Sequence, residues 1–185
     1  MAPSGPGLNA LIAQCHRLEA ALRDEAGAPD TSAAMHRFVA EMDARAAPPG
    51  LWSPLALAVL TMVGGIGVGI GLLSLLLRPA GPALAAFALV LACAVTALAL
   101  AIGVVAFMGG YSLGLVLLKR TALALATAGA LGLIAWSQGD MRAVGPVVAL
   151  LGGASAWLLM NSNAFYLFAG YRMALRVMQA QARRP

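Results

Sequence analysis

The glycine-rich stretch from Pro54 to Leu77 constrains the fold more than any other part of the chain. It contains no charged residue, and it is longer than the roughly 20 apolar residues that a helix needs to cross the hydrocarbon of a bilayer. A bilayer offers the backbone no other hydrogen-bond partners, so a run of this kind must be helical in spite of its glycines. We therefore predict a transmembrane helix over 54–77.

The glycines of this stretch are spaced for close helix contact. Gly65 and Gly69 form one pair at a spacing of four residues, and Gly67 and Gly71 form a second. Small residues at this spacing let the backbone of a neighbouring helix approach closely. Two interpretations remain open, which are tight packing inside one helical bundle and contact with another protein.

The pattern GIGVGIG over 65–71 is similar to the glycine ladder in the inner helix of rotary ATPase ring subunits. That family also carries an ion-binding carboxylate in the membrane, which has no counterpart in the apolar runs of this chain. We therefore do not assign the chain to that family. The pattern also lacks the preceding strand and the downstream acidic residue of a dinucleotide-binding motif.

Composition extends the membrane interpretation to most of the chain. Of its 185 residues 61% are hydrophobic and only 10% are charged, which is typical of a membrane protein. Three further apolar runs follow the first. The sequence thus predicts an all-α integral membrane protein whose domain over 51–172 has four transmembrane helices, at about 54–77, 83–108, 113–136 and 145–170.

The turns between these runs echo one another. Arg78-Pro-Ala-Gly-Pro82 before the second run resembles Arg142-Ala-Val-Gly-Pro146 before the fourth, and a Gly-Tyr pair follows both runs. Two parallel helical hairpins related by duplication are one explanation. Chance in a chain rich in glycine and alanine is the other.

Residues 1–50 have a different character and a net charge of −2, whereas the remainder carries +7. Apolar residues recur at helical spacing from Leu8 to Leu22 and again from Met35 to Met42, with a break at 27–30. We expect a cytoplasmic amphipathic helical hairpin followed by a linker. Two helices this short bury too little apolar surface to fold alone, so the hairpin should pack on its own membrane domain, on a second copy or on a partner.

Basic residues set the expected topology. Arg45, Lys119, Arg120, Arg172 and Arg176 lie near one set of helix ends, and only Arg78 and Arg142 lie near the other. The excess of positive charge predicts that both termini are cytoplasmic and that 173–185 is a basic cytoplasmic tail. The residues expected at the membrane interface are Trp52, Lys119, Arg120, Trp136, Tyr171, Arg172 and Arg176.

Residues that could carry chemistry are scarce. His16 and His36 have no acid or cysteine around them at the spacing of metal ligands, and the basic residues form no contiguous stripe for nucleic acid. The apolar runs contain no Asp, Glu or His, whereas ion-coupled transporters and the small four-helix multidrug exporters need an ionisable group in the membrane. We therefore expect no enzyme activity, no metal, no cofactor and no binding of nucleic acid.

The polar residues at depth are Asn161 and Asn163, with Ser162 between them. An asparagine in lipid is costly unless its amide finds a partner. We considered hydrogen bonds to neighbouring helices, contact with a partner protein, and a permeation pathway.

These observations favour a non-catalytic protein of a bacterial inner membrane that serves as a subunit, scaffold or assembly factor of a larger membrane complex. Its expected partners are other membrane subunits or further copies of itself, through Gly65, Gly67, Gly69, Gly71, Asn161 and Asn163. The bacterial origin rests on composition, because the alanine, glycine and arginine content is typical of a GC-rich genome. A self-assembling pore and an uncoupled carrier or flippase for a lipid-like substrate are the alternatives.

Overall fold

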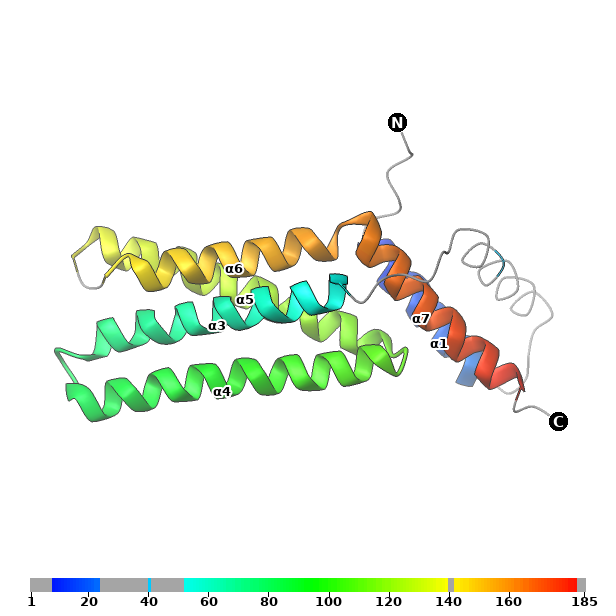
Figure 1. Ribbon diagram of the computed structural model, residues 1–185, viewed down its shortest axis with the longest axis horizontal. Helices are drawn as coiled ribbons and strands as arrows, with labels where there is room; N and C mark the ends of the chain where they lie inside the picture. Colours follow the sequence, from blue (N-terminus) through cyan, green and yellow to red (C-terminus); the bar gives the residue numbers. More distant parts are fainter. Residues whose placement is uncertain (1–7, 24–39, 41–51, 140–141, 183–185) are drawn as a thin grey trace, which may run out of the picture.

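The structure is a computed structural model that describes residues 8–23, 40, 52–139 and 142–182. Over these residues the regular elements are all α-helices. Helices α3, α4, α5 and α6 run side by side as a bundle, and α1 and α7 lie across one end of it (Figure 1). The second helix of the expected hairpin and most of the linker lie outside the described residues.

Three helices are long and apolar enough to cross a membrane, namely α3 (Trp52–Leu76), α4 (Gly81–Met108) and α5 (Ser112–Ser137). Their bounds agree closely with the first three predicted runs. Helices α6 (Val144–Met160) and α7 (Asn163–Ala182) meet at a bend of 60° and would provide a fourth span if the bent pair counts as one. An all-helical chain with three or four candidate membrane helices is therefore confirmed.

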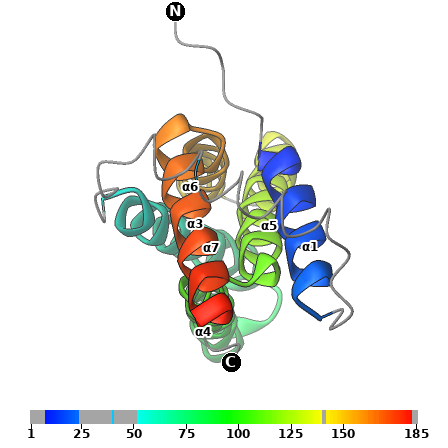
Figure 2. The same cartoon turned by 90° about the vertical axis from the view of Figure 1, so that its right-hand side faces the viewer.

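The bundle closes as a ring in which each helix packs on its sequence neighbours and α6 packs back on α3. The view along the bundle shows this order (Figure 2). The contact between α3 and α6 is the most extensive one and the contact between α4 and α5 is the least extensive of the four. Helix α4 is the most exposed of the three candidate membrane helices, since only 11% of its most apolar stretch is buried.

The fourth predicted run is not one continuous helix. Helix α6 ends at Met160, and Ser162 begins α7 by accepting a hydrogen bond on its Oγ from the backbone N–H of Phe165, at 3.3 Å. Serine is a preferred N-cap because it satisfies a backbone donor that the helix leaves free. The polar residues at 161–163 thus break the helix, which the prediction of a straight span over 145–170 missed.

Beyond the break, α7 turns across the end of the bundle and continues to Ala182. Phe165 and Phe168 are fully buried there, and both of their ring centroids lie 5.6 Å from that of Phe107 on α4. Met173 and Ala174 are also buried. The segment from 173 onward, predicted as a basic cytoplasmic tail, thus belongs to helix α7 as far as Ala182, and its location in the cytoplasm stays a prediction.

Helix α1 (Leu8–Arg23) packs on α5 and α7 at the same end. Cys15 is buried in the same core cluster as Phe107, and Ile12 packs against that cluster. Helix α1 therefore packs on the helices of its own chain, which is one of the three possibilities given for it above.

The two echoing turns differ in structure. Gly81 has a φ of +82° at the start of α4, with open space around it. Gly145 lies inside α6, where an added Cβ would meet the backbone of Gly71. The duplication stays a prediction.

Candidate functional site

The four glycines predicted for helix contact all lie at contacts between α3 and other helices of the same chain, on two faces of α3. On one face, a Cβ added to Gly67 would collide with the backbone of Ala149, and one added to Gly145 would collide with the backbone of Gly71. Both contacts are backbone against backbone, so neither helix can yield by moving a side chain. Only residues without a side chain allow α3 and α6 to lie this close.

The other face of α3 packs on α4. A Cβ on Gly65 would come within 2.6 Å of the Thr96 side chain, and one on Gly69 within 3.2 Å of the Leu89 carbonyl oxygen. Of the two interpretations of the ladder, packing inside one bundle accounts for all four glycines. A partner that contacts this protein must use another surface.

A laterally open groove between α4 and α5 is such a surface. Its cavity measures about 450 Å³, and Val68 and Leu72 of α3 line it together with residues of both flanking helices. A second cavity of about 220 Å³ shares Val68, Leu72 and Ala128 with it, but lies between α3, α5 and α6, where Pro146 and Ala149 also line it. The groove between α4 and α5 follows α4 from Ala88 to Ala99, or roughly 17 Å at 1.5 Å per residue.

Small residues at a spacing of four line both walls of the groove. They are Ala88, Ala92 and Thr96 on α4, and Ala124 and Ala128 on α5; Gly132 continues the α5 series in the second cavity. The Thr96 hydroxyl already donates to the Ala92 carbonyl oxygen at 2.8 Å, so it presents little polarity to the groove. Small residues at this spacing also bring α3 and α6 together, but in the described part of the chain no helix covers the opening of this groove, although Thr96 itself packs on Gly65 of α3.

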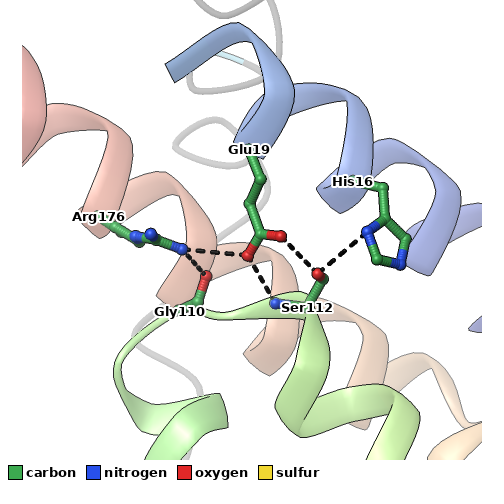
Figure 3. Close-up of polar contacts among 5 residues, drawn as sticks. All are labelled: His16, Glu19, Gly110, Ser112 and Arg176. Atoms are coloured by element: carbon green, nitrogen blue, oxygen red, sulfur yellow. Dashed lines mark hydrogen bonds and ion pairs between the residues drawn. The ribbon is translucent and has the colours of Figure 1, made fainter. Parts of the chain in front are cut away.

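A polar cluster joins α1 to the bundle (Figure 3). The Glu19 carboxylate accepts hydrogen bonds from the Ser112 backbone N–H at 2.8 Å, from the Ser112 hydroxyl at 2.5 Å and from Arg176 Nη1 at 3.1 Å. Arg176 also donates to the Gly110 carbonyl oxygen at 2.9 Å and lies over the Tyr111 ring. Residues from α1, α7 and the turn between α4 and α5 thus share one network.

Glu19 caps helix α5 from a distance. Ser112 is the first residue of α5, and Tyr111 before it provides no side-chain cap. Burial alone would raise the pKa of Glu19, but the hydrogen bonds from Ser112 and the charge of Arg176 outweigh it and hold that pKa below its usual value. Burial, reinforced by the negative charge of Glu19, raises the pKa of the Cys15 thiol to about 12.

The serine, histidine and glutamate of this cluster are not arranged for nucleophilic catalysis. A triad needs the histidine between the nucleophile and the acid, but here the Ser112 hydroxyl bonds directly to Glu19, with His16 Nδ1 on its other side at 3.3 Å. Ser112 is only 1% exposed, so no substrate reaches it. The cluster holds helices together.

The residues predicted at the membrane interface lie near both ends of the bundle. Trp52 and Trp136 are exposed, and Arg120 is exposed beside Lys119, whose Nζ donates to Asn9 Oδ1 at 2.6 Å. On α7, Tyr171 is half-buried and the Arg172 guanidinium lies 5.5 Å from the centre of the Phe168 ring. Contact of these residues with lipid headgroups stays a prediction.

Among the described residues, Asn161 and Asn163 make no side-chain hydrogen bond to another helix. Both are exposed, and the Asn161 amide donates to the Trp157 carbonyl oxygen of its own helix at 2.9 Å. Contact with a partner through these residues stays a prediction.

Within the described part of the chain, no three His, Cys, Asp or Glu side chains gather as a metal site would require. Comparisons with protein-family models, with curated proteins and with solved structures find no match to this chain. The class that the fold defines is an all-helical protein with three or four helices suited to a membrane.

Proposed function

We propose that this chain is a four-span protein of a bacterial inner membrane and a non-catalytic subunit of a larger membrane complex. The groove between α4 and α5 receives a transmembrane helix of the partner. One observation carries the proposal, which is that both walls of this groove carry small residues at a spacing of four and that no helix of the described chain covers its opening.

The lateral direction of the opening supports a helix as the occupant. The groove runs along α4 for roughly 17 Å, somewhat more than half of the roughly 30 Å hydrocarbon thickness of a bilayer. A partner helix lying in it would contact α3 at the floor and bury part of the bare face of α4. Association of this kind in lipid depends on close packing, for which small residues are suited.

Basic residues support the orientation. Lys119, next to Arg120, donates to Asn9 of α1, and Arg176 belongs to α7. Arg78 and Arg142 belong to the α3–α4 and α5–α6 turns, which lie at the opposite end of the bundle (Figure 1). This excess of positive charge supports a cytoplasmic location for the covered end. Helices α1 and α7 would then form a cytoplasmic cap, with both termini on that side.

The test is purification of the full chain from its native membranes in mild detergent, followed by measurement of the mass of the complex. Ala124→Leu fills the groove, while the matched Ala130→Leu makes the same change at an exposed position of α5 outside the groove. We expect the parent and Ala130→Leu to elute as a complex and Ala124→Leu to lose the partner. A monomeric parent chain, or equal behaviour of both variants, would contradict the proposal.

A further inference from the structure

The end of the bundle opposite α1 and α7 contains a separate pocket with two arginines. Arg78 lies in the turn after α3, and Arg142 lies just before α6, 64 positions further along the chain. Both line a cavity of about 480 Å³. A cavity of this size lies within the range of about 300–1,000 Å³ that is common for small-molecule sites.

Both basic residues of the outer turns line that pocket, and Asp140 is the one acidic residue of these turns. Between Arg45 and Lys119 the sequence has no Lys or Arg other than Arg78, and between Arg120 and Arg172 it has none other than Arg142. The two basic side chains of these outer turns therefore converge on one cavity, although they come from different turns. Arginine forms paired hydrogen bonds with phosphate oxygens more readily than lysine does.

The remainder of the pocket is largely apolar. It is lined by Ile70 and Leu73 of α3, by Leu77 directly after α3, and by Val144 at the start of α6. The one hydroxyl there, on Ser74, donates to the Gly71 carbonyl oxygen of its own helix at 2.9 Å. A ligand that fits must therefore carry negative charge at the rim and hydrocarbon along the helices.

We propose that this pocket binds an anionic phospholipid. Arg78 and Arg142 hold the phosphate of the headgroup, and an acyl chain lies against Ile70 and Leu73. This site is distinct from the groove between α4 and α5, and it does not depend on a protein partner.

Trp136 provides a local probe of this site. It is exposed in the last turn of α5, three residues before Gly139, which lines the pocket. With Trp52→Phe and Trp157→Phe, it is the remaining tryptophan of the chain. Quenching of its fluorescence by brominated phosphatidylglycerol, compared with brominated phosphatidylcholine in nanodiscs, measures the local preference for an anionic lipid. Both leaflets of a nanodisc have the same composition, so the result does not depend on topology.

We expect the parent chain to prefer phosphatidylglycerol and the double variant Arg78→Gln/Arg142→Gln to lose that preference. A basic residue near an anionic surface contributes about fivefold, so two should contribute about thirtyfold. The double variant Arg78→Lys/Arg142→Lys keeps the charge and should keep most of the preference. The variant Lys119→Gln/Arg120→Gln removes the same charge at the other end and should leave the signal of Trp136 unchanged.

Three results would overturn the proposal. One is an unchanged preference in Arg78→Gln/Arg142→Gln, and the second is an equal loss in Lys119→Gln/Arg120→Gln. The third is loss of the preference in the parent chain when inorganic phosphate is added, which would assign the pocket to a free anion.

Discussion

Replacing Glu19 by glutamine should release α1 from the bundle. The carboxylate accepts three hydrogen bonds, two from Ser112 and one from Arg176, and its side chain is only 13% exposed. A hydrogen bond to a charged acceptor contributes about 1 kcal/mol more than one to a neutral acceptor. Because the Arg176 side chain is 27% exposed and partly screened, we expect a loss of about 2 kcal/mol in the docking free energy.

Cys15 reports this docking directly. The thiol is 1% exposed, and its pKa is raised to about 12, so it should react slowly with a maleimide while α1 is docked. In a Cys93→Ala background it is the remaining cysteine. If opening is fast relative to labelling, the rate follows the open population, and 2 kcal/mol corresponds to an increase of about 30-fold.

The matched control is Arg17→Gln, which changes one charge on an exposed position of the same helix. It should leave the labelling rate of Cys15 within about twofold, since surface substitutions usually change stability by less than about 0.5 kcal/mol. Arg176→Gln should accelerate labelling, and combining it with Glu19→Gln should add less than the sum of the two effects. Equal rates for Glu19→Gln and the parent chain would refute the role of the cluster.

Acid should release α1 for the same reason. The pKa of Glu19 is lowered in the docked state, so its contribution to docking is complete above the usual value of 4.5 and is lost as the pH falls through the lowered value. A spin label on the exposed Ala20 of α1 should keep constant mobility at pH values above 4.5 and gain mobility as the pH falls through the lowered pKa. Glu19→Gln should remove this step, and a step that persists in that variant would contradict the assignment.

Three further predictions concern the bundle itself. Gly67→Ala should lower the melting temperature by an amount that corresponds to about 1–3 kcal/mol, since its Cβ would collide with the Ala149 backbone nitrogen. Gly69→Ala should change stability by less than about 1 kcal/mol, because its nearest contact, the Leu89 carbonyl oxygen, would lie 3.2 Å away. Ser162→Ala removes the cap of α7 and should cost about 1 kcal/mol in thermal unfolding. A cysteine at exposed Gln138 should react with an impermeant maleimide outside the cell, and one at exposed Ala13 only after permeabilisation.

Charge and length made most of the helices predictable. The runs over 54–77, 83–108 and 113–136 lack acidic residues and are bounded by turn residues, so only a long helix fits them. The pairing of the glycines could also be predicted from their spacing. Gly65 and Gly69 share one face of the helix, and Gly67 and Gly71 share another. Which helix meets each face is a matter of tertiary packing, which the spacing does not encode.

The break at 161–163 was missed although a signal for it exists. Asparagine and serine are residues that begin helices, but inside an apolar run we interpreted them as groups that bond across helices. The prediction for Arg172 and Arg176 considered only contact with the membrane surface. It did not include their packing on the rings of Phe168 and Tyr111. No local sequence pattern indicated the role of Glu19, because its hydrogen-bond partners Ser112 and Arg176 lie 93 and 157 positions away in the sequence.

The proposed partner helix in the groove is tested most directly by photo-crosslinking in intact native membranes. A photoreactive amino acid is placed at position 124 in the groove or at position 130 on the outer face of α5. We predict that position 124 crosslinks to one protein with a transmembrane segment and that position 130 does not. Crosslinks from position 124 to lipid alone would contradict a subunit role and favour a carrier for a lipid-like substrate.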